Sequence, residues 1–420
     1  MTISETIAYI QQFSKSGKPV TDLSRIRSLL KELGNPQEQL HFVHVAGTNG
    51  KGSVVAYGSA ASIAAGIQTG QFTSPFVLHY QDRIQVNGKD IPDDRLCALC
   101  ERVIACHVSK ACSQFEITFA IALLYFLEQE CELVFLETGL GGLLDATNVI
   151  TAPLVSIITS ISFDHMEILG KTLPEIAMQK AGIIKQHCPV VLSPDNSDVV
   201  REMIKMTAEQ KQSAVIIPDL RNSTILKETL TESQFQYEGQ IYTLHMPGRH
   251  QIYNALSALS ALNILQKRGF DISDAAIRTA LSTVQLPARI QILKQNPLVL
   301  VDGGHNASGI AALTAILKQN KRHPIIGILG MVKGKDYQTA IKELSEVLDI
   351  VICVDDFSPQ AIPAEVLVTC FPKKLKTHIM PHHEAMSFAM KIAEEANGCV
   401  VVSGSLYLSS AFLEQESIQL

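Results

Sequence analysis

The stretch that decides the fold is Val45-Ala46-Gly47-Thr48-Asn49-Gly50-Lys51-Gly52-Ser53, which follows the mainly apolar run Leu40–His44. A buried strand that opens into glycines, a lysine and a serine is typical of a loop that holds phosphate. The glycines let backbone N–H groups turn inward, the ammonium group neutralises phosphate oxygens, and the hydroxyl group can reach a magnesium ion. A helix expected over Val54–Ala65 would point its positive amino-terminal end at the same phosphates. We therefore predict that the chain binds ATP.

The loop departs from the common pattern at one position. That pattern places Ser or Thr directly after the lysine, whereas Gly52 stands between Lys51 and Ser53 here. The alternative is a glycine-rich strand-to-helix turn without a ligand. Lys51 argues against it, because a purely structural turn needs no cation at its tip. The motif alone predicts a nucleotide and leaves the reaction open.

Composition restricts the class of protein. The chain has 420 residues, 46% hydrophobic and 18% charged, which is typical of a soluble globular protein of two or three domains. A net charge of −6 gives no electrostatic footprint for nucleic acid or an anionic membrane. Met1–Lys15 is too polar for a signal peptide, and Ile117–Leu127, the most apolar stretch, is too short to span a bilayer.

The nine cysteines indicate a reducing compartment, because their number is odd and their spacing irregular. We therefore expect a cytoplasmic protein. Cys97 and Cys100 form a C-x-x-C pair, but no second pair stands at the spacing of a zinc site. With Leu96, Leu99 and Val103 they read as one face of a helix rather than a metal or redox centre.

The first 190 residues alternate apolar runs with amphipathic segments, which predicts a mostly parallel sheet with helices on both faces. The expected strands are Phe42–Ala46, Thr69–Thr73, Leu133–Glu137, Val155–Thr159 and Val190–Leu192. The expected helices are Val54–Ala65, Asp93–His107, Glu116–Glu128 and Leu173–Ile184.

A second α/β unit is expected from near Pro287. Before it, Phe235–Met246 reads as a hairpin that turns at Glu238-Gly239, and Asn254–Gln266 reads as a helix. The later strands are expected at Leu298–Val301, Ile325–Leu329, Ile350–Val354 and Cys399–Ser403. The predicted fold is thus α/β with two domains: residues 1–285, an ATP-binding P-loop-type sheet, and residues 286–420, a smaller Rossmann-like domain.

Polar side chains follow the carboxyl ends of the expected strands, where open α/β sheets hold their sites. Ser74, Glu137 and His165 offer a hydroxyl, a carboxylate and an imidazole near the loop, and together suit Mg²⁺ bound to phosphate. Each alone has an ordinary explanation in turn capping or hydrogen bonding. Lys180 ends an expected helix, where it either caps carbonyl groups or is held neutral and takes up carbon dioxide as a carbamate.

The second domain carries its own candidates. Asp302-Gly303-Gly304-His305-Asn306 follows a strand, and an acid, two glycines and a histidine there suggest a site. Arg289 supplies a cation that could reach a triphosphate at the domain junction. Ser403-Gly404-Ser405 ends the last strand and could hydrogen-bond a second substrate. A surface arginine and an ordinary turn remain the alternatives.

Taken together, the segments resemble the folylpolyglutamate synthase/dihydrofolate synthase family of the Mur ligase superfamily, over nearly the whole chain. The segments that carry the resemblance are Ala46–Ser53, Thr73–Phe76 with Asp82–Ile84, Glu137–Gly142, Leu144–Asn148, Asp164-His165, Lys180–Ile183, Asp302–Asn306 and Ser403–Leu406.

The resemblance implies a role for each matching residue. ATP would contact the loop and three later residues: Thr48, Asn49, Gly50, Lys51, Gly52, Ser53, Asn254, Arg289 and Asp302. Mg²⁺ would be held by Ser74, Glu137 and His165. Lys51, a carbamylated Lys180 and His305 would be catalytic. The substrates would meet Arg83, Phe115, Glu116, Leu144, Asp145, Ala146, Thr147 and Ser405, with L-glutamate near His305 and Ser405.

Three positions depart from the family pattern. Thr138 replaces a valine, Leu143 an arginine, and Ala288 a glycine before the junction arginine. The lost arginine affects a substrate contact rather than the metal site. The retained Leu144-Asp145-Ala146-Thr147 segment looks more like family members that also act on dihydropteroate.

The resemblance implies an ATP- and Mg²⁺-dependent ligase that adds L-glutamate to a folate, and possible dihydropteroate use follows from the retained segment. The partners are then small molecules, with no nucleic acid and no membrane, and we expect a monomer. Two alternatives stay open. One is another ligase of the superfamily that acts on a cell-wall precursor; the other is a nucleotide-dependent ATPase switch, which would leave Asp302–Asn306 without a role.

Overall fold

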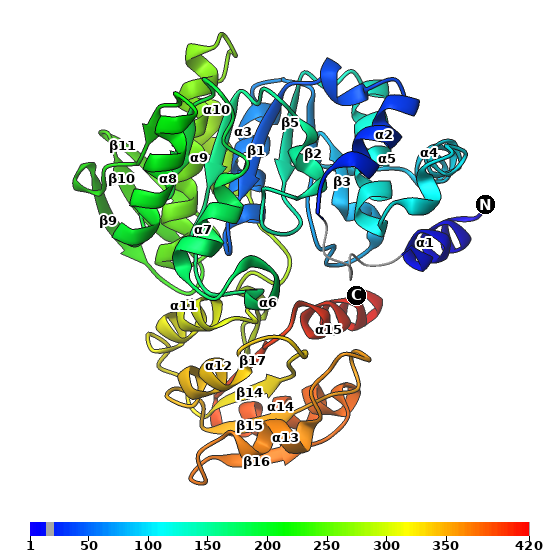
Figure 1. The fold of residues 1–420 in the computed structure, drawn as a ribbon. Coiled ribbons are helices and arrows are strands. Elements are labelled where there is room, and N and C mark those ends of the chain that lie inside the picture. The colour runs from blue at the N-terminus through cyan, green and yellow to red at the C-terminus, as the bar shows by residue number, and fades with distance from the viewer. Residues whose placement is uncertain (14–20, 420) are drawn as a thin grey trace. The chain divides into compact units, whose positions relative to one another are not determined.

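The structure is a computed structural model that describes residues 1–13 and 21–419, with side chains described as far as Glu414 within the last helix. The chain divides into two compact units (Figure 1). The first unit comprises residues 1–162, 166–222 and 253–283, and the second comprises residues 163–165, 223–252 and 284–420. The tripeptide Phe163–His165 therefore packs with the second unit, although its neighbours in the chain belong to the first.

The first unit is built on an eight-stranded sheet in the order β4-β3-β2-β5-β1-β6-β7-β8. The six strands from β2 to β8 in this order are parallel, and β3 and β4 add an antiparallel edge. The strands are β1 (Phe42–Ala46), β2 (Thr69–Phe72), β3 (Ile84–Val86), β4 (Lys89–Asp90), β5 (Leu133–Glu137), β6 (Val155–Ile158), β7 (Val190–Leu192) and β8 (Val215–Ile216). Strands β1, β5 and β6 are buried along their whole length, as central strands of a parallel sheet should be.

Helices cover both faces of this sheet. They are α1 (Ile3–Gln12), α2 (Ser24–Glu32), α3 (Lys51–Ala64), α4 (Asp93–Ile104), α5 (Gln114–Glu128), α6 (Met166–Leu169), α7 (Leu173–Ala181), α8 (Asp198–Gln210) and α10 (Asp274–Thr283). One core joins α1, α2, α4 and α5 to β1, β2 and β5, and another joins α7 and α8 to β6 and β7. Helix α3 packs against β1, β2 and β5, and α10 packs against α3.

The second unit contains two sheets. A six-stranded sheet has the order β12-β13-β17-β14-β15-β16, parallel except for the edge strand β12. Its strands are β12 (Gln291–Lys294), β13 (Leu298–Val301), β14 (Ile325–Leu329), β15 (Ile350–Cys353), β16 (Lys376–Ile379) and β17 (Cys399–Ser403). Its helices are α11 (Ala307–Leu317), α12 (Tyr337–Leu344), α13 (Ala364–Thr369), α14 (His382–Ala396) and α15 (Leu406–Gln419).

A small antiparallel sheet, β9 (Ser223–Glu228), β10 (Ser233–Tyr237) and β11 (Gln240–Leu244), also belongs to the second unit. Helix α9 (Arg249–Lys267) follows it; its residues up to Ile252 fall in the second unit and those from Tyr253 in the first. The domain limits of 1–285 and 286–420 stay a prediction. Each compact unit is made of three separate stretches of the chain, so a single boundary in the sequence does not describe them.

The two-domain α/β fold is confirmed, and most predicted strands match to within a residue. The expected hairpin turn is also confirmed, because Glu238 and Gly239 both have positive φ, as a tight turn between β10 and β11 requires. Cys97 and Cys100 lie on α4, and all nine cysteines are free. Among the described residues, no helix is both long and apolar enough to cross a membrane.

Helix ends were predicted less well. Helix α3 begins at Lys51 rather than Val54, because Gly50 has φ of 88° and ends the loop directly before it. Helices α4 and α7 each end three residues before the predicted end. The short or exposed edge strands β3, β4, β8, β9, β12 and β16 were not predicted, since so few residues carry little periodicity.

The contact between α3 and the sheet depends on Gly58. A Cβ atom at this position would lie 2.3 Å from Cε1 of Phe135, a buried ring on β5. Helix propensity alone predicts that Gly58→Ala stabilises the protein by about 1 kcal/mol. We expect the opposite, a loss of about 1–3 kcal/mol, because the ring must move within a packed core. Guanidinium unfolding followed by circular dichroism measures the sign.

A matched control is Ala60→Gly on the same helix, which should cost about 1 kcal/mol through propensity alone. An increase in stability for Gly58→Ala would show that the core yields freely around Phe135.

Candidate active site

The loop between β1 and α3 is shaped by two glycines. Gly50 adopts φ of 88°, and a Cβ atom there would lie 2.2 Å from Oδ1 of Asn254. At Gly47 a Cβ atom would lie 1.7 Å from Oγ1 of Thr159. Asn254, on α9, thus lies directly against the loop, as expected for a residue of the same site. Close approach of backbone to neighbours is the reason these positions need glycine.

The end of β6 holds the loop in place. The N–H of Thr48 donates to the carbonyl oxygen of Ser160 at 2.8 Å, and Oγ1 of Thr159 donates to the carbonyl oxygen of Asn49 at 2.7 Å. The hydroxyl group of Thr48 also exchanges two hydrogen bonds of 3.1 Å with the backbone of Ser162. The predicted phosphate contacts Thr48 and Asn49 are therefore fixed before any ligand binds.

Two lysines converge on one carbonyl oxygen of this loop. Nζ of Lys51 lies 3.3 Å from the oxygen of Gly47, and Nζ of Lys180 lies 2.7 Å from the same atom. Lys180 is on α7 and only 3% exposed, so its bond to the loop does not cap its own helix. Carbamylation of Lys180 stays a prediction. The contact between Lys180 and the Gly47 carbonyl oxygen does not depend on that modification.

Glu137 and Ser74 lie beside Lys51. Oε1 of Glu137 is 3.7 Å from Nζ of Lys51, and Oε2 accepts the N–H of Ser74 at 3.4 Å. Glu137 is buried at the end of β5, and Gly52 on the first turn of α3 would bring a Cβ atom within 3.6 Å of it. A carboxylate and a hydroxyl are hard oxygen donors, so this pair fits a magnesium ion held against phosphate.

The third proposed metal ligand, His165, packs in the second unit. It has a positive φ of 49°, and Nε2 is 3.1 Å from Nζ of Lys335. The neighbouring Asp164 binds the same lysine through Oδ1 at 2.6 Å. Oδ2 of Asp164 accepts the side-chain amide of Asn306 at 3.2 Å and is 3.8 Å from Nε2 of His305.

Asp164 is the charged centre of this cluster. Burial by itself would raise the pKa of its carboxyl group. The nearby His305 side chain and the positive charges of Lys335 and His165 outweigh burial and hold that pKa well below its ordinary range. Nδ1 of His305 donates to the carbonyl oxygen of Gly303 at 3.0 Å, which orients the ring, and Nε2 lies 3.8 Å from Oδ2 of Asp164.

Arg289 is presented by a strained turn. Ala288 and Ile290, on either side of it, have φ of 55° and 50°, which is rare for alanine and a clear outlier for a β-branched residue. The carboxylate of Asp302 braces the turn by accepting the N–H of Ile290 at 3.1 Å and that of Gly304 at 2.8 Å. Burial raises the pKa of Asp302, although the Arg289 charge opposes this. A positive φ also explains why glycine would suit position 288.

Two predicted substrate residues are positioned by aromatic contacts. Phe115 packs on Phe72 with ring centroids 5.6 Å apart, and a Cβ atom at Gly139 would lie 2.7 Å from its ring. The guanidinium of Arg83 lies 5.2 Å from the ring centroids of both Phe76 and Tyr80. Stacked in this way, a guanidinium can still donate to an anionic substrate.

The segment Leu144–Thr147 is built around a buried hydrogen-bond network. Oδ1 of Asp145 accepts the hydroxyl of Thr147 at 2.5 Å, and Oδ2 accepts the N–H of Leu140 at 2.8 Å. Nε2 of His44, on β1, is 2.8 Å from the same hydroxyl. Since that hydroxyl donates to Asp145, it accepts from His44. Asp145 thus shapes the turn that carries Ala146 and Leu144, and burial raises its pKa.

Two other predicted substrate residues have structural partners. Glu116 closes the capping box of α5 by accepting the N–H of Ser113 at 2.6 Å, and its Oε2 is 3.5 Å from Arg25. The Ser405 hydroxyl accepts the N–H of Tyr407 at 3.2 Å at the start of α15. Their substrate contacts stay predictions.

Sequence reasoning missed three residues of these clusters as site residues: His44, Asp164 and Lys335. A histidine inside an otherwise apolar strand was a usable signal for His44. Lys335 follows β14 in Lys333-Gly334-Lys335, a basic loop at a strand end. Its partner Asp164 is distant in sequence, so no local pattern could pair them.

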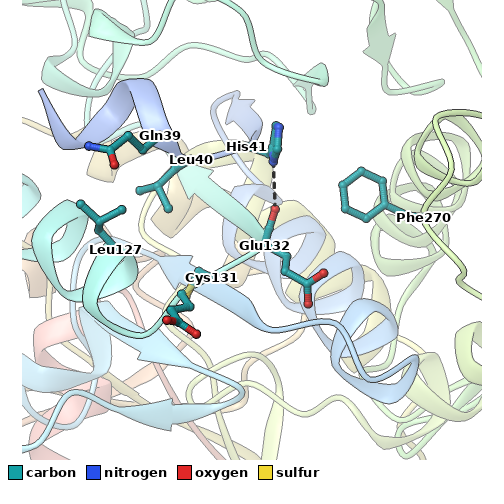
Figure 2. Close-up of a pocket in the computed structure, with 8 residues that line it drawn as sticks. Gln39, Leu40, His41, Leu127, Cys131, Glu132 and Phe270 are labelled. Carbon is teal, nitrogen blue, oxygen red and sulfur yellow. Dashed lines mark hydrogen bonds between the residues drawn. The ribbon is translucent and has the colours of Figure 1, made fainter.

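Figure 2 shows a surface pocket of about 500 Å³ that holds none of the predicted site residues. It is lined by Gln39–His41 before β1, by Glu130–Glu132 before β5, and by Leu127 and Phe270. The pocket therefore lies at the amino ends of these strands, whereas the phosphate loop and Glu137 lie at their carboxyl ends, where open parallel sheets bind ligands.

Comparison with known proteins gives matches over the whole chain. Residues 45–262 match the Mur ligase middle domain, and residues 288–406 match the Mur ligase glutamate ligase domain. The chain is 34% identical to the folylpolyglutamate synthase of Lacticaseibacillus casei, over 98% of both chains. It is 34% identical to the dihydrofolate synthase/folylpolyglutamate synthase of Bacillus subtilis, over 92% of this chain and 93% of the relative.

Solved structures agree with these matches. The folylpolyglutamate synthase of Mycobacterium tuberculosis, complexed with ADP and AMPPCP, is 27% identical with a TM-score of 0.87, covering 98% of this chain and 97% of that one. The Escherichia coli FolC in complex with DHPP and ADP is 26% identical with a TM-score of 0.88, covering 100% of this chain and 98% of that one.

His44 gives a pH dependence of stability. Burial lowers the pKa of its imidazole to about 3, against about 6.5 in an unfolded chain. Below pH 6.5 the unfolded state binds the extra proton and the folded state does not. The contribution of His44 is therefore complete above pH 6.5 and is lost as pH falls toward 3, by about 1.4 kcal/mol per pH unit.

Unfolding by guanidinium between pH 7 and pH 4 measures this slope, and His44→Gln, which keeps a donor toward Thr147, should reduce the slope by the His44 contribution. His250, a second buried histidine whose pKa is lowered to about 4, adds a slope of the same sign, and His250→Gln should remove that separate contribution. An imidazole of His44 that titrates near pH 6.5 by NMR would contradict the expectation.

Proposed function

The chain belongs to the folylpolyglutamate synthase/dihydrofolate synthase family of the Mur ligases, and on that premise we propose that it joins L-glutamate to the carboxylate of a folate at the expense of ATP. The observation that carries the proposal is the convergence of Lys51 and Lys180 on the Gly47 carbonyl, with Glu137 beside them. This is a phosphate site with a metal-binding carboxylate, in a chain that also matches a glutamate ligase domain.

The reaction requires a carboxylate to be activated, because a carboxylate is a poor electrophile. A carboxylate oxygen attacks the γ-phosphorus of ATP, the bond to ADP breaks, and an acyl phosphate forms. The amine of glutamate, having lost a proton, then attacks the acyl carbon. The C–O bond to phosphate breaks, so the products are an amide, ADP and phosphate.

The loop residues account for the first step. The backbone N–H groups of the first turn of α3, Lys51 to Ser53, and the ammonium of Lys51 are the donors proposed for the phosphate oxygens, whose negative charge must be stabilised as the phosphoryl group moves. The N–H groups of Thr48 and Asn49 are bonded to the carbonyl oxygen of Ser160 after β6, which holds the loop in place beside these donors. Lys180 fixes the Gly47 end of the loop from α7.

The metal site is proposed from donor chemistry. Ser74 and Glu137 would hold Mg²⁺ as oxygen ligands, with His165 as the third ligand by family resemblance. When bound, Mg²⁺ supplies positive charge to the phosphate oxygens. Lys51 and the N–H of Ser74 orient the Glu137 carboxylate for this role.

The second unit is proposed to supply the glutamate contacts. By the family resemblance His305 meets glutamate, whereas Arg289 and Asp302 contact ATP; the three share one local framework in which Asp302 braces the Arg289 turn and Gly303 orients His305. Lys335, paired with Asp164, adds a cation to the same cluster. An amino acid substrate carries two carboxylates, so a cationic cluster of this kind suits it.

Use of dihydropteroate as a second acceptor is also proposed. The Bacillus subtilis relative carries both synthase names, and the Escherichia coli structure contains DHPP. The Leu144–Thr147 turn, built on Asp145 and His44, is the segment that supports this activity here. As a small-molecule enzyme with nine free cysteines, the protein is inferred to work in the cytoplasm.

One assay tests the function. Purified protein receives ATP, Mg²⁺ and glutamate with either tetrahydrofolate or dihydropteroate, and phosphate release and product mass are measured. We expect a mass gain of one glutamate, with phosphate release that depends on both substrates. Lys51→Met should lower kcat/KM by about a hundred- to a thousandfold, since a phosphate-stabilising cation is lost. Lys205→Met, an exposed lysine on α8, is the matched control.

Three outcomes distinguish the alternatives when the same assay is repeated with a cell-wall precursor as the acceptor. Phosphate release that ignores folate and glutamate would indicate an ATPase switch. Turnover with a cell-wall precursor and none with either pterin substrate would indicate another ligase of the superfamily. Wild-type turnover in Lys51→Met would remove the assigned role of the loop.

The magnesium ligands are tested separately through Glu137→Gln. Losing the charged ligand should raise the Mg²⁺ concentration for half-maximal activity by about ten- to a hundredfold, with a smaller change in KM for folate. Glu132 lies directly before β5, at the opposite end of that strand from Glu137. Glu132→Gln should therefore leave the Mg²⁺ titration unchanged. A titration of Glu137→Gln that overlies the wild-type curve would rule Glu137 out as a ligand.

A further inference from the structure

We propose that Asp356, His382 and His383 form a binding site for a divalent transition-metal ion such as Zn²⁺, separate from the residues assigned to the ligase reaction. Asp356 lies in the loop after β15, and the two histidines begin α14; both elements belong to the second unit (Figure 1). The ligand atoms of the three side chains all lie within 4.8 Å of one another. The proposal does not rest on the proposed function.

The contact between Asp356 and His382 has the geometry of two ligands of one ion. Nδ1 of His382 is 2.9 Å from Oδ2 of Asp356, yet this buried nitrogen makes no hydrogen bond with any of the residues that the structure describes. A hydrogen bond needs the oxygen in line with the ring N–H. Ligands about 2.1 Å from one metal at tetrahedral or octahedral angles lie about 3.0–3.4 Å apart and off each other's axis. An ion placed along the lone-pair direction of His382 Nδ1 would therefore also lie beside the Asp356 carboxylate.

Ordinary histidine–aspartate pairs of this protein look different. Nδ1 of His323 is 2.8 Å from Oδ2 of Asp349, and Nε2 of His79 is 2.6 Å from Oδ2 of Asp90, and both contacts are aligned hydrogen bonds. Neither pair has a third ligand among the described residues. The Asp356 cluster is thus distinguished by its alignment as well as by its composition.

The third ligand is available from the adjacent side chain. Nδ1 of His383 is 4.0 Å from Oδ2 of Asp356, and its side chain is 61% exposed, so a small rotation closes the remaining gap. Nε2 of His383 faces Oε1 of Glu384 at 3.7 Å. A proton on Nε2 that points to this carboxylate leaves the Nδ1 lone pair for a metal, the arrangement that commonly supports histidine ligands.

The carboxylate is also held in position. Oδ1 of Asp356 accepts the N–H of His382 at 2.8 Å, which leaves Oδ2 toward the imidazoles. Phe412 packs edge-on against the His382 ring at 6.1 Å and limits its rotation.

Donor chemistry selects the class of ion. Two imidazole nitrogens and one carboxylate suit Zn²⁺, Co²⁺ or Ni²⁺, whereas Mg²⁺ prefers oxygen ligands and retains its water. Bound there, the ion would cross-link the loop after β15 to the first turn of α14. Water or a small anion would complete its coordination.

Zinc binding tests the proposal directly. Full-length protein freed of metal with a chelator is titrated with ZnCl₂ by calorimetry in excess Mg²⁺, which occupies sites that prefer hard ligands. We expect saturable binding by wild type that weakens about tenfold or more in His383→Ala and in Asp356→Asn. His323→Gln, which removes a histidine from a two-residue pair, should leave the isotherm unchanged.

His383→Ala decides the test, because the exposed side chain can be removed without disturbing the core; circular dichroism checks the fold. Co²⁺ gives a second readout, since its visible absorption bands report nitrogen ligands and should weaken in this variant. No saturable Zn²⁺ binding by wild type, an unchanged isotherm in His383→Ala, or an equal loss in His323→Gln would each overturn the proposal.

Discussion

The carbonyl oxygen of Gly47 is the point on which the site depends, because it receives ammonium groups from two directions. Lys51 approaches from the helix that follows the loop, and Lys180 approaches from the end of α7. The loop is thereby tied to two helices, while the end of β6 ties it to the sheet. A phosphate-binding loop of mobile glycines would lose conformational entropy on binding, whereas this loop is already ordered by partners distributed across the unit.

Local sequence patterns predicted the central elements well, for a physical reason. Strands such as β1 and β5 are buried on both faces, so their sequences are mainly apolar, with His44 the exception in β1, and the polar residues that end or follow them mark the carboxyl edge of the sheet. This is why Ser74 and Glu137 could be predicted to lie together from their positions relative to strand ends. Edge strands of two or three residues carry too few positions for any period to show.

Partners distant in sequence could not be predicted. Nothing near His44 indicates that Thr147 will accept its hydrogen bond, and nothing near Asp164 indicates Lys335. Asp145 shows a related limit: the sequence marks it as polar and next to a loop, but only the structure shows that both of its oxygens are engaged by the turn itself. Residue type predicts what a side chain can do, and folding decides which of its atoms remain available.

The two left-handed residues that flank Arg289 have a consequence for evolution. One oxygen of Asp302 accepts the N–H of Ile290, and the carbonyl oxygen of Ala288 accepts the N–H of Gly303, so both strained residues are held by the loop that follows β13. Exchange of Asp302 for a residue without an acceptor oxygen would remove the bond that holds Ile290. Substitutions at Ile290 and Asp302 should therefore be coupled, whereas glycine at 288 or 290 relieves the strain without a change at Asp302.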